Sequence, residues 1–179
     1  MKVVDTVSVT ISHVIGTTTL IIVFISVTMF YTMSYLPLQT EALAQQLQEV
    51  TDYVSASLVD LVSLCFISPT DQILIKGLEM PENIGTYLYI VTLKNTTNPI
   101  THERLLVVQA FFDSRPSIYM ESLLPWSMEG KIRIWNGTEI NNPRFWPRVF
   151  ISSGASNLVA WALKQGEEIT VGLGVMNKD

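Results

Sequence analysis

An uncharged stretch near the N-terminus constrains this chain more than any other feature of its sequence. No Lys, Arg, Asp or Glu occurs from Thr6 to Thr40, and the part from Val14 to Leu36 is mostly apolar. A helix needs about 20 such residues to cross a bilayer core of about 30 Å, and this segment exceeds that length. Because a backbone in lipid must satisfy its own hydrogen bonds, we predict a transmembrane helix at 14–36 behind a short tail at 1–13.

Two other interpretations of this stretch stay open. A cleaved secretory signal would use the small residues Ala42-Leu43-Ala44 as its cleavage site, although the apolar run is longer than a usual signal core and Lys2 is its only basic flank. A buried helix of a soluble protein is the other alternative. A permanent membrane anchor is the interpretation that the length of the run favours.

The basic residues predict an orientation. Lys2 precedes the apolar segment, and the next basic residue in the chain is Lys76. Positively charged flanks stay on the cytoplasmic side of a membrane. We therefore expect a single-pass protein of the cell membrane, with a cytoplasmic N-terminus and the remainder of the chain outside the cell.

An amphipathic helix is predicted directly after the span, at 37–66, with Pro37 kinking or separating the two helices. Apolar side chains recur there at steps of three and four residues, which is the period of one helical face. The residues on this stripe are Leu43, Leu47, Val50, Val54, Leu58, Leu61 and Cys65. Two roles are open: the stripe packs on the protein's own globular part, or it also packs on copies of itself.

The remainder, 67–179, is predicted to be a β-rich head domain. Short runs of β-forming residues alternate with turn signals rich in Asn, Gly and Pro, which is typical of a small sandwich. The runs are 72–76, 86–93, 105–112, 131–135, 146–152, 158–163 and 169–175, and residues 159–163 have a helical turn as their alternative. The expected fold class is α+β: a long N-terminal helix, transmembrane with an amphipathic continuation, followed by a small antiparallel β-sandwich head.

Composition narrows the classes of function. With 48 % apolar and 15 % charged residues the chain is not expected to be disordered, and its single cysteine excludes a disulfide scaffold. A net charge of −5 argues against nucleic acid as a partner.

Reactive side chains form no recognisable catalytic pattern. The two histidines, His13 and His102, are expected to lie too far apart to share a site, and Cys65 is expected to be a buried thiol on the apolar stripe. We expect no catalytic residues, no metal site and no cofactor. The pair Glu167-Glu168 is interpreted as solvated surface, and the three tryptophans Trp126, Trp135 and Trp146 as packing residues rather than a carbohydrate-binding face.

Two sequons suit a head outside the cell. Asn95-Thr96-Thr97 and Asn136-Gly137-Thr138 both fall in predicted loops, so Asn95 and Asn136 are candidate N-glycosylation sites.

This order of parts resembles the archaeal type IV pilin-like proteins, which include archaellum components and pseudopilins. Residues 78–89, LEMPENIGTYLY, are similar to a stretch common after the helix in that family, L-x-L-P-x-x-I-G-G-x-x-Y. Here Met80 precedes the proline and Thr86 replaces the second glycine. The chain differs from such prepilins in having no Lys/Arg-Gly junction before its apolar segment.

The resemblance implies a non-enzymatic cell-envelope protein whose N-terminal helices bundle into a filament core. The expected partners are the membrane, further copies of the chain or other pilin-like subunits, and a surface-layer protein. The alternative is a monomeric, surface-exposed binding module or stator-like protein that contacts the surface layer. An enzyme or a substrate-binding subunit of a membrane complex is a third and less favoured interpretation.

Overall fold

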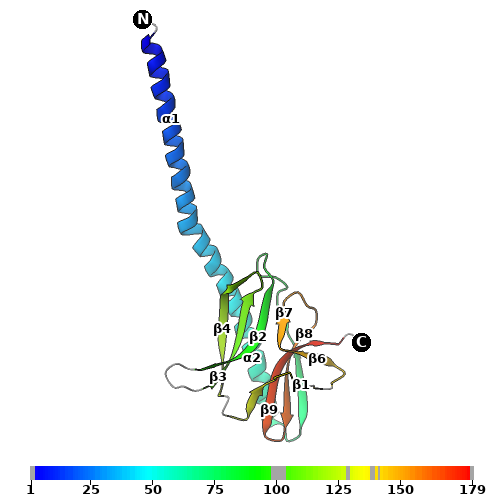
Figure 1. The fold of residues 1–179 in the computed structure, drawn as a ribbon. Coiled ribbons are helices and arrows are strands. Elements are labelled where there is room, and N and C mark those ends of the chain that lie inside the picture. The colour runs from blue at the N-terminus through cyan, green and yellow to red at the C-terminus, as the bar shows by residue number, and fades with distance from the viewer. Residues whose placement is uncertain (1–2, 98–103, 128–129, 138–139, 141, 178–179) are drawn as a thin grey trace. The chain divides into compact units, whose positions relative to one another are not determined.

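A computed structural model describes residues 3–97, 104–127, 130–137, 140 and 142–177 (Figure 1). The chain forms two compact units, Met1–Ala42 and Leu43–Asp179. The first unit is helical. The second contains the remainder of the helix and the strands described below.

The helical part has three consecutive elements: α1 (Val3–Phe30), a five-residue π-helical turn η1 (Tyr31–Tyr35), and α2 (Leu36–Ile67). Pro37 explains the widened turn. It lacks an N–H, and its ring would meet the carbonyl group of Met33 in a regular α-helix. In η1 the N–H of Leu36 donates to the oxygen of Tyr31 instead. Pro37 therefore brings a local change of helix type.

From His13 to Ala42 every side chain is exposed apart from the half-buried Ser34. Among the described residues one continuous helix, His13–Ile67, is long and apolar enough to cross a membrane, and its most apolar part is not buried by any other part of the chain. A membrane span and a signal sequence both fit this description.

The strands form two sheets (Figure 1). The first has the order β1-β8-β9-β5, and β6 also pairs with β9; the second has the order β4-β3-β2-β7. The bounds are β1 Gln72–Gly77, β2 Tyr89–Thr97, β3 Arg104–Phe112, β4 Arg115–Ser127, β5 Ile132–Ile134, β6 Phe145–Arg148, β7 Phe150–Ser152, β8 Leu158–Gln165 and β9 Glu168–Met176.

The head is thus made of β-sheets, as the sequence predicts, but the strand map differs in four places. The predicted strand 146–152 is two strands in different sheets, divided at Val149, and the predicted strand 86–93 begins only at Tyr89. The long strand β4 was not predicted. Of the described pairings, β5 with β9 is parallel, so the sheets are not purely antiparallel.

One main core joins α2 to both sheets. Apolar residues of α2 pack in a single cluster with inward-facing residues of β2 and β3 from one sheet and of β8 and β9 from the other. A smaller cluster of Phe145, Val159 and Trp161 lies on the opposite face of β8. Because successive side chains of a strand point to opposite faces, β8 contributes to both clusters.

Candidate functional site

A groove lies between α2 and the segment that joins β1 to β2. Its volume is about 420 Å³. The helix contributes Gln46, Glu49, Val50 and Tyr53, and the joining segment contributes Glu79, Met80, Pro81, Asn83 and Ile84. Apolar side chains therefore alternate with carboxylates and amides along its wall.

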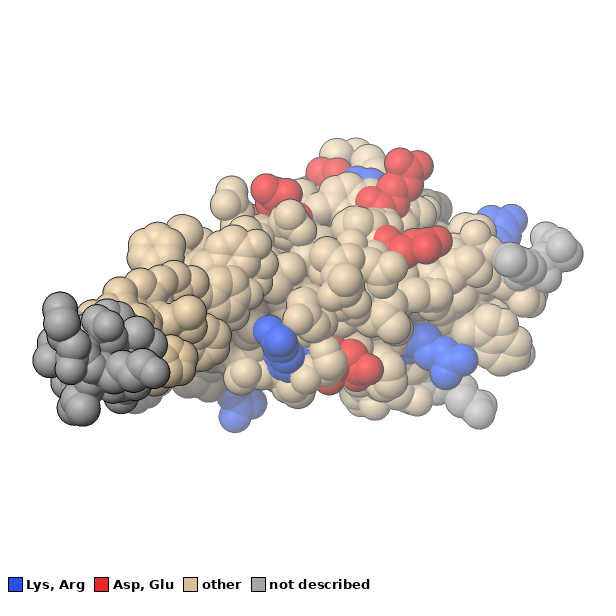
Figure 2. All heavy atoms as spheres, turned by 90° about the horizontal axis from the view of Figure 1, so that it is seen from above, with Lys and Arg blue, Asp and Glu red and all other residues tan. Residues whose placement is uncertain are grey.

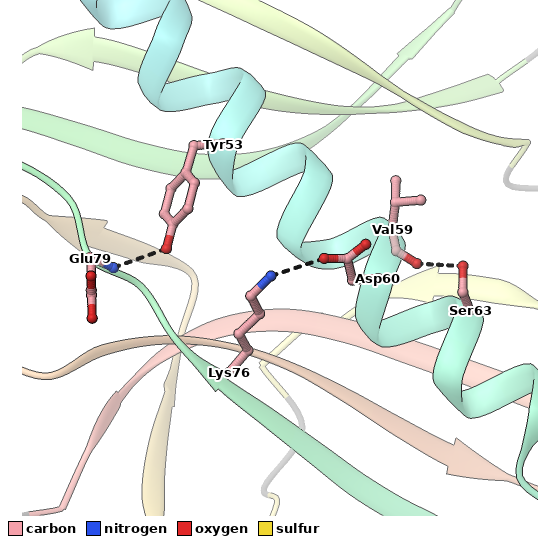
Figure 3. Close-up of polar contacts among 6 residues, drawn as sticks. All are labelled: Tyr53, Val59, Asp60, Ser63, Lys76 and Glu79. Carbon is pink, nitrogen blue, oxygen red and sulfur yellow. Dashed lines mark hydrogen bonds and ion pairs between the residues drawn. The ribbon is translucent and has the colours of Figure 1, made fainter.

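Three contacts hold the walls of the groove: one ties the joining segment to the helix, one ties β1 to the helix, and one ties the joining segment to β2. The backbone N–H of Glu79 donates to the hydroxyl oxygen of Tyr53 at 3.2 Å, and Lys76 pairs with Asp60 at 3.0 Å (Figure 3). The hydroxyl group of Tyr89 donates to the carbonyl oxygen of Pro81 at 2.6 Å. The groove is consequently preformed within the second unit.

The turn at the end of this segment depends on Gly85. Its φ is +62°, in the left-handed region that glycine adopts at little cost. Around it the backbone groups of Ile84 and Tyr87 exchange hydrogen bonds of 3.0 and 3.1 Å. These residues belong to the stretch that resembles the pilin-like families, and in the structure the stretch forms a groove wall followed by a tight turn.

The groove is acidic. Glu49 and Glu79 line it, Glu82 is exposed beside it, and no Lys or Arg is among its lining residues. The ion pairs found among the described residues are Lys76–Asp60, Lys131–Glu167 and Arg133–Glu168, so none of them neutralises Glu49 or Glu79. Figure 2, which does not mark the groove, shows several Asp and Glu side chains with a Lys or Arg group among them along the upper edge of its view.

Exposed basic and large apolar side chains follow one another in the chain along β6 and β7, which belong to different sheets. Trp146, Val149 and Phe150 are 61 %, 59 % and 57 % exposed, although they are large and apolar. Arg144 and Arg148 are exposed among them and take part in none of the ion pairs seen in the described part of the chain. We call residues 144–150 the basic segment.

The seven stripe residues of the amphipathic helix lie inside the second unit. Leu47, Val54, Leu58 and Cys65 are fully buried, Val50 and Leu61 are at most 5 % exposed, and Leu43 packs against the same cluster. These side chains contact the chain's own strands. The face of α2 that they form is therefore not available to a second copy in this fold.

Cys65 is buried as predicted, and burial raises the pKa of its thiol, with the charge of Lys164 acting in the opposite direction. A buried thiol that stays protonated is a poor nucleophile and metal ligand.

The two candidate glycosylation sites differ in setting. Asn136 follows β5 in an exposed loop, as predicted. The loop prediction for Asn95 is wrong, because Asn95 lies in β2 opposite Leu106; its side chain is nevertheless exposed. Thr97 of that sequon is also exposed, whereas Thr138 of the other lies outside the described residues.

The other reactive side chains are dispersed. In the part of the chain that the structure describes, no three His, Cys, Asp or Glu residues are placed to hold a metal ion. His13 is exposed on α1, and His102 lies outside the described residues. Glu167 and Glu168 pair with Lys131 at 2.7 Å and Arg133 at 2.9 Å on the surface.

The three tryptophans do not share one face. Trp126 packs against the main core, Trp135 packs edge-on against Trp161 at 6.2 Å between ring centroids, and Trp146 is exposed.

The hydroxyl groups of the apolar helix bond to their own backbone. Thr17, Thr18, Thr19, Ser26, Thr28 and Thr32 each donate to a carbonyl oxygen three or four residues earlier. Such bonds satisfy a hydroxyl group without any second helix.

Sequence reasoning did not find the groove or the basic segment. Glu49 and Glu79 are distant in the chain, so only the fold reveals that they share a wall. For the basic segment a signal was present: residues 140–166 contain Arg144, Arg148 and Lys164 but no Asp or Glu. No family model, curated protein or solved structure was found to match the chain.

Proposed function

We propose that this protein is a non-enzymatic, membrane-anchored protein of the cell envelope, of pilin-like build. The observation that carries the proposal is the uncharged helix from Val14 to Leu36, whose apolar side chains are exposed along its length. A soluble protein rarely exposes so large an apolar surface, and a lipid bilayer would cover it. The self-satisfied hydroxyl groups support this, because a polar group in lipid needs a partner.

We further propose that the head lies outside the cell. The charge pattern supports this, since Lys2 precedes the span and no further Lys or Arg occurs until Lys76. The exposed sequon residues Asn95 and Asn136 are consistent with that location.

Assembly into a filament, or service as a minor pilin-like component, is the favoured role. Two features support it. The first is the order of an apolar helix, a buried helical continuation and a β-rich head. The second is the resemblance of residues 78–89 to a stretch found in archaeal pilin-like proteins. Because the stripe from Leu47 to Cys65 is buried in the head, contacts between helices would be made by the apolar segment at 14–36. The head would be a small β-sandwich, an assignment supported by the core residues that its two sheets share.

A monomeric surface module, such as a stator-like protein that contacts the surface layer, is the second candidate. The burial of the helical stripe and the internal bonds of the span hydroxyl groups favour it, since both leave fewer groups that require a neighbouring helix.

Labelling of cysteine variants in intact cells tests anchoring and topology together. Cys65 is buried and gives little background. Ser114→Cys places a thiol on the exposed turn after β3, and Thr18→Cys places one on the exposed face of the apolar helix. A membrane-impermeant maleimide should label Ser114→Cys without permeabilisation, while Thr18→Cys stays unlabelled until detergent is added.

Labelling of Ser114→Cys only after permeabilisation would contradict the outside location of the head. Ready labelling of Thr18→Cys in intact cells would contradict burial of the helix in lipid. The wild-type chain, with Cys65 alone, is the matched control.

Shearing of surface filaments separates the two candidate roles. A filament subunit should appear in the sheared fraction, and deletion of its gene should change filament number or length. A monomeric module should remain in the membrane fraction and leave the filaments of the deletion strain normal.

A further inference from the structure

Two exposed surfaces of the second unit carry opposite charges that the described chain leaves unneutralised. The acidic groove has Glu49 and Glu79 on its wall and Glu82 beside it. The basic segment has Arg144 and Arg148 among exposed aromatic residues. The carboxylates of the groove and the guanidinium groups of the basic segment form no ion pairs among the described residues. Opposite charges of this kind are complementary across many protein interfaces.

The two surfaces also match in their apolar content. The groove offers Val50, Met80, Pro81 and Ile84 between its carboxylates, together with the ring of Tyr53. The basic segment offers Trp146 and Phe150, both more than half exposed. Aromatic and arginine side chains are the residues most enriched where protein interfaces bind tightly.

We propose that the groove of one copy binds the basic segment of a second copy of this chain. An arginine of the segment places its guanidinium group against Glu49 or Glu79, and an adjacent aromatic ring covers Met80 and Pro81. Tyr53 can receive the planar guanidinium group on its ring face. The groove, at about 420 Å³, lies within the ~300–1,000 Å³ range of clefts that hold small organic groups.

This inference rests on the proposed function in one respect. Anchoring in one membrane, or in one filament, concentrates the heads and strengthens a contact that is weak in dilute solution. Because groove and segment are different surfaces of the same chain, each copy has one of each to offer its neighbours. The contact would hold heads together in addition to any packing of the apolar helices.

Charge reversal on each surface provides the test. The groove variant carries Glu49→Arg and Glu79→Arg, and the segment variant carries Arg144→Glu and Arg148→Glu. All four side chains are exposed, so the fold should be retained. The self-association of the full-length protein is measured in detergent micelles by sedimentation equilibrium, at low and at high salt.

Each variant alone should associate at least about tenfold more weakly than the wild type, because it opposes like charges and loses its ion pairs. An equimolar mixture of the two variants should associate again, since the basic segment of the groove variant then meets the acidic groove of the segment variant. Added salt should weaken the association of the wild type. Asp113→Arg and Lys94→Glu, which change exposed charges outside both surfaces, are controls that should associate as the wild type does.

Equal association of the wild type and both variants would overturn the proposal, and so would a mixture that associates no better than either variant alone. These outcomes leave membrane anchoring intact, because anchoring is measured separately by the cysteine labels. A failure of anchoring with restored association in the mixture would contradict the proposed function but not this contact.

Discussion

Gly172 gives Trp161 the space that its indole ring occupies in the smaller core cluster. A Cβ atom at Gly172 would lie 2.3 Å from Cζ2 of Trp161. The ring is held from a second direction, because its Nε1 donates to the carbonyl oxygen of Leu173 at 2.9 Å. The sequence pattern Gly172-Leu173-Gly174 predicts a bulge or a small-residue face, and the unbroken register of β8 with β9 shows that it is the latter.

We therefore expect Gly172→Ala to lower the free energy of unfolding by about 1–3 kcal/mol, the usual cost of overpacking a rigid core. Gly77→Ala is the matched control in β1, since nothing lies within 4 Å of a Cβ atom there, and it should change stability by less than about 0.5 kcal/mol. Urea unfolding of the full-length protein in detergent, followed by tryptophan fluorescence, measures both. Equal stability of the two variants would show that the indole ring moves aside freely.

The raised pKa of Tyr89 predicts that the folded protein loses stability at high pH. Burial raises the pKa of its hydroxyl group from 10.0 to about 12. The unfolded chain therefore loses this proton first as pH rises. The contribution of Tyr89 is fully present below about pH 10 and decreases between about pH 10 and about pH 12.

Tyr89→Phe keeps the ring but removes the titrating group and the hydrogen bond to Pro81. The variant should be less stable near neutral pH, and its free energy of unfolding should fall less steeply with pH above about pH 10. Denaturant unfolding at a series of pH values measures both slopes. Identical slopes would mean that another group causes the alkaline loss.

At the scale of elements, α2 shows most clearly what periodicity can predict. Its apolar stripe and the burial of its inward face follow from the spacing of side chains along one helix. Its end at Ile67 follows from the helix-breaking residues Ser68-Pro69. Periodicity does not say which surface will cover the stripe. The stripe is covered by strands that come later in the chain, and the spacing along the helix does not identify them.

Leu58→Ala should lower the free energy of unfolding by about 2–5 kcal/mol, because it opens a cavity in the main core at a fully buried position. Leu64→Ala makes the same change on the same helix at a side chain that is 56 % exposed, and it should cost less than about 0.5 kcal/mol. Thermal and urea unfolding compare the two. Similar costs would mean that α2 is not packed against the strands as described.

The long strand β4, which the sequence does not predict, contains two prolines. Asp113-Ser114-Arg115-Pro116 predicts a turn, yet β4 begins at Arg115 and includes Pro116 and Pro125. In this sheet β4 pairs only with β3, and an edge strand tolerates proline because one row of its N–H groups needs no partner. Pro147 lies likewise in β6, which pairs only with β9. Edge position is a property of the sheet and is not visible in a local sequence pattern.

The alternative of a helical turn at residues 159–163 is wrong for a related reason, because these residues lie in β8. Ala160 and Ala162 disfavour a strand by propensity, although Trp161 favours one. Pairing with β1 on one side and β9 on the other makes β8 an interior strand, and this tertiary setting overrides local preference.

At the scale of the whole molecule, the sequence predicts the division into an apolar helix and a β-rich head more readily than it predicts the groove on the head. The uncharged segment is visible as a single run, and so are the acidic residues that follow it. The groove combines residues of a helix and a distant loop, so a linear sequence does not predict it. The apolar helix is therefore predictable from composition, whereas the proposed contact between heads requires the fold.

In the proposed function, residues 14–36 hold the mature protein in the envelope. The most direct measurement is the intact mass and N-terminal sequence of the protein from its native membrane and from sheared surface filaments. We predict a chain that retains the whole of 14–36 in one or both of these fractions. A mature chain that begins after Ala44 and is recovered in the soluble fraction would show that the apolar helix is a cleaved signal, and would contradict permanent anchoring by residues 14–36.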